Sequence, residues 1–336
     1  MTTVRPAFHK DILRLDAEST CEQIERKLRE DVLHILHRRG AVIGISGGID
    51  SSVTLALAAR ALGKERVVGV LMPEHDSSPE SVDLALTLAE RFGVAAVVEN
   101  ISPALEGFGC YRQRDEAVAR VFPDFDPRAD KFKIILPQDI LNQETLSLFS
   151  ITLVRPDGSE VTRRLPPTEY LQIVAASNFK QRSRMAMLYY HAEQRNYAVV
   201  GTPNKHEHDQ GFFVKYGDGG TDVMPIAHLY KTQVYQLAHY LGIPDEIVRR
   251  PPTADTYSAQ ATQEEFFFQL PFDLLDLLWY GYENGYEPAE VAPALNLTEE
   301  QVARVFRNLQ RKQRATEYLR TPPLRSQAQA VGVSPH

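Results

Sequence analysis

The stretch GISGGIDSS at residues 44–52 decides the fold of the N-terminal half of the chain. It follows the apolar run AVI at 41–43 and precedes VTLALAARAL at 53–62, which has the composition of a buried helix. Gly47 and Gly48 allow the backbone to approach an anion with several N–H groups pointing at it. The helix that follows adds the positive end of its dipole. We therefore expect a strand, an anion-binding turn and a helix. A tight turn capped by Asp and Ser side chains, with no ligand, is the alternative.

Two common phosphate-binding patterns do not fit this turn. No lysine follows the glycines as in the Walker A pattern GxxxxGK[ST], and the spacing G-x-x-G-G is not GxGxxG. The turn instead contains S-G-G-x-D-S, in which Ser46, Ser51 and Ser52 can donate to phosphate oxygens. Asp50 would repel a polyphosphate unless a cation lay between them, and Mg²⁺ favours carboxylate together with phosphate oxygens. The turn therefore predicts a site for a polyphosphate with Mg²⁺.

Apolar strands and helices alternate around the turn. RVVGVLM at 66–72 is a continuous apolar run typical of a strand buried in a parallel sheet. A further strand is predicted at 95–98 and a helix at 81–92, ended by Gly93. Before the turn, a helix over 16–39 would bury one face made of Ile24, Leu28, Val32, Ile35 and Leu36. This order predicts an α/β fold with a doubly wound parallel sheet flanked by helices.

The alternation breaks in the middle of the chain. Residues 105–168 look irregular, and PDG at 156–158 between two strand-like runs predicts an inserted β-hairpin. Helical periodicity returns at 178–193, followed by a strand at 197–202 and a helix at 230–241. Residues 285–336 are expected to form a helical C-terminal extension, with a capping box from Thr298 to Gln301. We expect residues 1–336 to form a single domain.

Composition excludes several classes of partner. A net charge of -7 disfavours nucleic acid as a partner. The two cysteines, Cys21 and Cys110, are too few for a disulfide framework and lack metal-site spacing. The N-terminal MTTVRPAFHKD has no hydrophobic signal core, and no apolar run approaches the roughly 18 residues that span a bilayer. We expect a cytoplasmic protein that binds neither nucleic acid nor a membrane.

The motif SGGxDS resembles the PP-loop of the N-type ATP pyrophosphatases. The second half of the chain is similar to one member of that superfamily, NAD synthetase, in the segments 178–185 (NFKQRSRM), 199–244 and 251–255 (PPTAD). Only about 40 residues precede Gly44, too few for a glutamine-hydrolysing domain, so the resemblance is to the ammonia-dependent type. It implies ATP-dependent amidation of deamido-NAD by ammonia through an acyl-adenylate, giving NAD, AMP and pyrophosphate. It also implies a homodimer.

The resemblance further implies a set of site residues. Ser46, Asp50 and Lys231 would be catalytic, and Asp50 and Glu207 would hold Mg²⁺. ATP would contact Gly44, Ile45, Ser46, Gly47, Gly48, Ile49, Asp50, Ser51, Thr202, Lys231 and Thr253. Deamido-NAD would contact Asn178, Arg182, Lys215, Asp218 and Asp222.

Three departures from the resemblance leave other hypotheses open. The segment 105–168 is longer than the link usual in the family, and the residues around Glu207 differ from common forms. Arg314-Ala315 stands where a substrate-contacting His-Lys or Tyr-Lys pair is frequent. A PP-loop ligase that amidates another carboxylate is one alternative, and a nucleotide-binding protein that has lost catalysis is another. The run HEHD at 206–209 also suggests zinc, although its spacing is not H-E-x-x-H.

Overall fold

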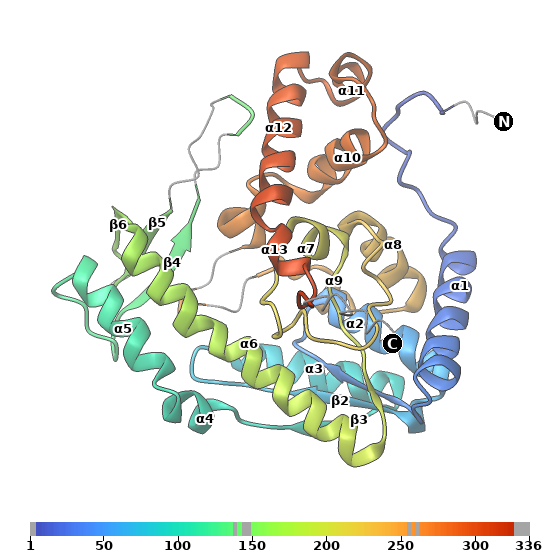
Figure 1. Cartoon of the computed structure of the whole chain (residues 1–336), viewed down its shortest axis with the longest axis horizontal. Helices are drawn as coiled ribbons and strands as arrows, with labels where there is room; N and C mark the ends of the chain where they lie inside the picture. The colour runs from blue at the N-terminus through green and yellow to red at the C-terminus, as the bar shows by residue number, and fades with distance from the viewer. Residues whose placement is uncertain (1–4, 137–139, 143–148, 254–256, 260–261, 326–336) are drawn as a thin grey trace, which may run out of the picture.

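The computed structural model describes residues 5–136, 140–142, 149–253, 257–259 and 262–325. Its centre is a parallel sheet with the strand order β3-β2-β1-β7. The strands β2 and β3 of this sheet are labelled in Figure 1. The chain moves outward from β1 through β2 to β3 and returns to the other side of β1 as β7, which confirms the doubly wound fold. Ligands of such sheets bind beyond the carboxyl ends of the strands where the order reverses, here between β1 and β7. The strands are β1 (Ala41–Gly44), β2 (Val67–Leu71), β3 (Ala95–Val98) and β7 (Ala198–Val199).

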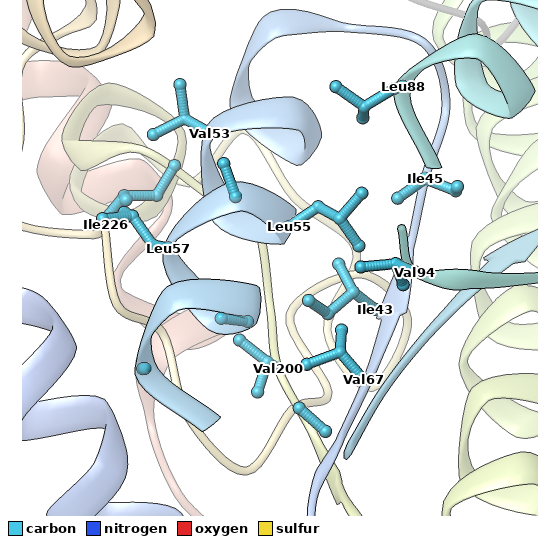
Figure 2. Packing of buried hydrophobic residues seen from close by; sticks show 14 of the residues in the cluster. Ile43, Ile45, Val53, Leu55, Leu57, Val67, Leu88, Val94, Val200 and Ile226 are labelled. Carbon is cyan, nitrogen blue, oxygen red and sulfur yellow. The ribbon is translucent and has the colours of Figure 1, made fainter. Parts of the chain in front are cut away.

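Helices cover both faces of this sheet, so its central strands are apolar on both sides. Along β1, Ile43 packs into a core shared with α2 (Ile49–Leu62), while its neighbour Val42 packs into a core on the opposite face with α6 (Pro167–Arg195). This alternation follows from the two-residue period of a strand. Figure 2 shows the first of these cores, in which Leu55 of α2 is fully buried against the sheet. Burial of such a side chain contributes about 1.5–3 kcal/mol.

The N-terminal helix differs from its prediction at the C-terminal end. The α-helix α1 (Ala17–Arg29) continues as a π-helix, η1 (Glu30–Ile35). A π-turn contains more residues than an α-turn and rotates the following side chains around the axis. Ile24, Leu28 and Val32 are buried as expected, but Ile35 is 58% exposed, so its predicted burial was wrong.

The segment 105–168 contains more regular structure than its sequence indicates. The predicted hairpin is confirmed as β5 (Ser150–Val154) and β6 (Glu160–Arg164), with Gly158 in the left-handed conformation at the turn. A third antiparallel strand, β4 (Lys131–Ile135), pairs with β5. The helices α4 (Ser102–Gly107) and α5 (Cys110–Val121) occupy the start of a segment that we expected to be irregular. The buried face of α5 includes the charged residue Arg114, which interrupts the helical spacing of apolar residues in the sequence.

Helices dominate the second half. The long helix α6 begins at Pro167, well before the predicted start at 178, and ends at the left-handed Asn196. The predicted helix at 230–241 is α8 (Lys231–Leu241), and the capping box of Thr298 and Gln301 is confirmed. In the described part of the chain, no helix has the length and apolar character to cross a membrane. The remaining helices are η2 (Lys64–Arg66), α3 (Pro79–Phe92), α7 (Lys205–Gln210), α9 (Asp245–Val248), η3 (Glu264–Phe268), α10 (Phe272–Glu283), α11 (Pro288–Leu295), α12 (Glu299–Ala315) and α13 (Glu317–Arg320).

Candidate active site

The glycine loop lies at the carboxyl end of β1, where the strand order reverses. Gly47 has a φ of +71°, and a Cβ at this position would lie 2.7 Å from the carbonyl oxygen of Ser81 in α3. Only glycine meets both conditions, the left-handed backbone and the close approach. The loop then enters α2, whose free N–H groups face its ligand side. Ser51 Oγ lies 3.3 Å from both Ser46 N and Ser46 Oγ, so the two serines hold the turn.

The loop after β7 brings the two predicted metal carboxylates together through one residue, Asn204. Its side chain accepts a hydrogen bond from Glu207 N, and its own backbone N–H donates to Glu207 Oε2 at 3.0 Å. This capping box starts α7. The Asn204 amide Nδ2 also donates to Asp50 Oδ1 at 3.1 Å. Sequence reasoning missed Asn204, although an Asn three residues before a Glu is a recognisable capping pattern.

Lys231 is fully buried at the first position of α8, which excludes the surface position that an isolated helical lysine would suggest. Its Nζ donates to Asp50 Oδ2 at 2.5 Å. Burial alone would lower the pKa of Lys231, but the negative charges of Asp50 and Glu207 outweigh it and raise the pKa. The lysine is therefore charged at neutral pH and faces both carboxylates.

Glu207 lies beside this pair, and no cation among the described residues forms an ion pair with it. Its Oε1 accepts a hydrogen bond from Gln263 Nε2 at 3.2 Å. Desolvation by the surrounding protein, followed by repulsion from Asp50, raises the pKa of Glu207 to about 8. An added positive charge between Glu207 and Asp50 would relieve both effects.

Two cavities meet at these residues. A small polar cavity of about 140 Å³ is lined by part of the glycine loop, Asp50 and Lys231, together with Arg250, which we did not predict. A large cavity of about 560 Å³ extends from Gly44 and Ile45 along α6. The residues that line both cavities are Ser46, Thr202, Glu207, Thr253 and Gln263.

Most of the residues predicted to bind ATP lie in the wall of the small cavity: Ser46, Gly48, Ile49, Asp50, Ser51, Thr202, Lys231 and Thr253. Gly44 and Ile45 line the large cavity instead. Gly47 lines neither cavity and packs closely against Ser81 of α3. Thr253 belongs to the predicted segment PPTAD, whose last two residues, 254 and 255, lie outside the described residues.

The residues predicted to bind deamido-NAD divide into two groups. Asn178 and Asp218 line the large cavity. Arg182, Lys215 and Asp222 do not line it. Arg182 is exposed on α6, whereas Arg184 on the same helix lies in the cavity wall.

Lys215 and Asp222 have structural partners. Lys215 Nζ donates to the carbonyl oxygens of Tyr318 (2.9 Å) and Thr321 (2.6 Å), which ties the C-terminal helix α13 to the loop beside the cavity. Asp222 accepts from Val199 N at 2.8 Å and from the Tyr189 hydroxyl at 2.9 Å, which completes the edge of β7.

Asp218 is solvent-accessible in the large cavity, yet protein atoms surround it closely. Desolvation raises its pKa to about 6, even though Val214 N donates to its Oδ1 at 2.7 Å. A carboxyl group in this position titrates close to physiological pH.

A buried ionic cluster, of which Lys180 lines the large cavity, escaped the sequence prediction. Lys180 of α6 is 1% exposed and donates to Glu74 (3.1 Å) and Asp76 (2.6 Å), which follow β2. Arg114 of α5 also binds Asp76, at 2.5 Å. Arg114 and Lys180 are distant in sequence from Glu74 and Asp76, so no local pattern could have indicated the cluster.

The first histidine of the HEHD run has a structural role. His206 is buried and hydrogen-bonds to Asp276 of α10 through Nε2 and to Gln210 through Nδ1. Asp276 in turn accepts from Thr232 N at 2.7 Å, so the histidine joins α7, α8 and α10. No group of three or more potential metal-ligating His, Cys, Asp or Glu side chains occurs among the described residues.

Known proteins resemble the chain over most of its length. The family model described as NAD synthase matches residues 20–123 and 155–323, so its match is interrupted across β4 and β5. The NH(3)-dependent NAD(+) synthetase of Rhizobium meliloti is 50% identical over 319 residues, which cover 95% of both chains. The protein of the same name from Thermotoga maritima is 37% identical, over 82% of this chain and 90% of its own.

Solved structures share the fold. An NH3-dependent NAD synthetase from Campylobacter jejuni has a TM-score of 0.61 and 22% identity, covering 93% of this chain and 100% of its own. An NMN synthetase from Francisella tularensis has a TM-score of 0.62 and 21% identity, covering 94% and 100%. These structural matches support the fold alone, and the family rests on the sequence matches. The chain belongs to the NAD synthase family.

Proposed function

We propose that the chain catalyses the ATP-dependent amidation of deamido-NAD by ammonia, giving NAD, AMP and pyrophosphate. Family membership implies the use of ATP. The name shared by the relatives at 50% and 37% identity supports the amidation of deamido-NAD by ammonia.

The observation that carries the proposal is the shared wall of the two cavities. The small cavity combines phosphate-binding loop N–H groups with Asp50 and Lys231, and the large cavity has room for an extended substrate. Adenylation requires the substrate carboxylate to meet the α-phosphate of ATP, so the two ligands must touch. Ser46, Thr202 and Glu207 line both cavities, and we place the reacting atoms beside them.

In the first half-reaction, a carboxylate oxygen of deamido-NAD forms a bond to the α-phosphorus. The bond from that phosphorus to the bridging oxygen breaks, and its electron pair leaves with pyrophosphate. Lys231 and the loop N–H groups stabilise the charge that develops on the leaving group. Ser46 and Ser51 supply hydroxyl donors beside the same phosphates. No protein nucleophile is needed.

Asp50 and Glu207 would hold Mg²⁺ at this site. Their fit rests on the donor set, because two carboxylates lie beside the phosphate loop. Desolvation and repulsion from Asp50 raise the pKa of Glu207 to about 8, and a cation beside it would favour its charged form. When bound, Mg²⁺ would neutralise phosphate charge. The protein contributes the orientation of both carboxylates through Asn204.

In the second half-reaction, ammonia attacks the acyl carbon of the adenylate. The carbon–nitrogen bond forms, AMP leaves with the electron pair of the broken acyl–oxygen bond, and a proton is released to water. Enclosure of the acyl-adenylate in the joined cavities would protect it from hydrolysis. We propose Asn178 and Asp218 as contacts of the dinucleotide, because both line the large cavity.

A homodimer in the cytoplasm completes the proposal. We place the dimer surface on the helix α6, which carries the exposed side chains Leu171 and Tyr190. Such a dimer would give the exposed Arg182, on the same helix, a site in the partner's cavity. Lys215 and Asp222 would act indirectly, by holding the loops around the dinucleotide. Sedimentation equilibrium at micromolar concentration would test the dimer.

The function is tested by incubating the protein with ATP, Mg²⁺, ammonium and deamido-NAD, and by quantifying AMP and NAD together. Equal amounts of both products support the proposal. AMP formation only with another carboxylic acid would show a different amide ligase. Tight ATP binding without turnover of any acid would show a nucleotide-binding protein without catalysis.

A further inference from the structure

Arg250 is a cationic residue in the wall of the small cavity. The resemblance given in the sequence analysis implies no role for it. It follows α9 and directly precedes Pro251 and Pro252. A residue before proline disfavours the helical backbone region, and proline itself fixes φ. The backbone is therefore restricted where it carries the guanidinium.

The Arg250 guanidinium has a neutral partner. Its Nη2 donates to Ser81 Oγ at 2.8 Å. Among the described residues, no carboxylate lies within the 4.0 Å that defines an ion pair with it. The adjacent Arg249, by contrast, pairs with Asp245 at 2.9 Å on the surface.

The charges around the small cavity leave Arg250 available for an anion. Lys231 also lines the cavity, but its charge is matched by Asp50 at 2.5 Å. Arg250 brings five N–H donors in a planar fork, of which the contact with Ser81 uses one. Such a fork suits phosphate oxygens better than a lysine does.

We propose that Arg250 is a further catalytic residue, which binds the β- and γ-phosphates of ATP and stabilises the leaving pyrophosphate. The inference rests on the proposed function. As the substrate carboxylate bonds to the α-phosphorus, the electron pair of the broken bridge moves onto the β-phosphate, where the guanidinium meets it. No proton is transferred in this step. Arg250 exchanges its contact with the Ser81 hydroxyl for phosphate oxygens.

The discriminating experiment compares the binding of Mg²⁺–ATP with that of AMP, by calorimetry, for the full-length protein and four variants. AMP lacks the β- and γ-phosphates, so Arg250→Gln is expected to weaken ATP binding about 10- to 100-fold and AMP binding hardly at all. Inhibition by pyrophosphate should weaken by a similar factor, and AMP formation should slow about 100-fold. Arg250→Lys should recover part of the ATP affinity, because it retains a point charge. Arg249→Gln, the matched control on the surface, should match the unsubstituted protein.

Ser81→Ala separates phosphate binding from a structural role. If Arg250 only ties its loop to α3, removal of the Ser81 hydroxyl should reproduce the defect of Arg250→Gln, and that outcome would overturn the proposal. An unchanged ratio of ATP to AMP affinity in Arg250→Gln would overturn it as well. A selective loss of ATP and pyrophosphate affinity in Arg250→Gln alone would support it. The binding experiment needs no carboxylate substrate, so failure to amidate deamido-NAD would refute only the proposed function.

Discussion

Replacement of Lys231 by methionine removes one charge from the centre of the small cavity and keeps the length of the side chain. In the structure, Lys231 is fully buried and its Nζ lies 2.5 Å from Asp50 Oδ2. The substitution leaves Asp50 and Glu207 facing each other without the cation between them. We expect the variant to lose stability and activity for separable reasons.

The loss of stability follows from the distance. At 2.5 Å and an effective dielectric constant of about 20, the attraction is about 7 kcal/mol before desolvation is subtracted. Removing one partner of a buried pair costs about 3–5 kcal/mol. Because the Asp50 side chain keeps 15% of its surface exposed, water can solvate the orphaned carboxylate, and we expect about 3 kcal/mol. The catalytic loss is that of one preorganised donor, about 10²–10³ in turnover.

Two assays on four proteins test this reasoning: urea denaturation and AMP formation for the unsubstituted chain, Lys231→Met, Asp50→Asn and the double variant. The double variant should be more stable than the sum of the single losses predicts, with a coupling of about 1–3 kcal/mol, and should still be inactive. Lys205→Met is the matched control, because Lys205 pairs with Asp209 at 2.8 Å and lines neither cavity. Strictly additive losses, or turnover by Lys231→Met within tenfold of the unsubstituted rate, would refute the roles given to this pair.

The other predictions concern the loop and two titrating groups. Gly47→Ala should abolish ATP binding, because its Cβ would lie 2.7 Å from Ser81 O, and should destabilise the chain by at least about 1–2 kcal/mol from its positive φ alone. Gly158→Ala is the control, because Gly158 has a φ of +82° but an added Cβ would have no atom within 4 Å. Calorimetry should show that this control retains ATP binding. Because the pKa of Asp218 is raised, the folded state binds more protons than the unfolded state between pH 3.8 and about 6, so stability falls as pH rises through this window. Urea denaturation of Asp218→Asn should show a shallower fall. An identical slope would contradict the raised pKa of Asp218. Burial lowers the pKa of Lys312 from 10.5 to about 7, so the unfolded state binds more protons between these two pH values and stability should rise with pH across them. Urea denaturation of Lys312→Met should lack this rise. A rise that persists in the variant would contradict the lowered pKa of Lys312.

Local patterns in the sequence were sufficient to predict the sheet and the glycine loop. The apolar runs that became β1 and β2 are buried on both faces, so their continuous hydrophobicity identified them directly. The turn at 156–158 carried its own conformational signal in Gly158. The helix α5 escaped prediction because Arg114 is buried through an ion pair with Asp76, which only the fold brings near.

The site was predictable where its residues follow the loop, and not where distant segments meet. Asp50 was predicted from the chemistry of the loop and Glu207 from the resemblance, but the side chain that joins them, Asn204, was visible only as a helix cap. Arg250 gave no local signal, since an arginine before two prolines is ordinary at the end of a helix. Its position in the cavity depends on how α9 packs, through the buried Ile247, onto the main core.

Asn204 has a consequence for anyone who engineers this chain for heat resistance. Asn and Ser start helices almost equally well, so replacing the fully buried Asn204 with serine would preserve an acceptor for Glu207 N. Serine does not offer the amide N–H₂ that Asn204 gives to Asp50. A screen that selects on melting temperature would register little change for this substitution, although Asn204 also orients the carboxylates of Asp50 and Glu207. Tolerance at residue 204 has to be judged by turnover, because thermal stability reports only half of what this side chain does.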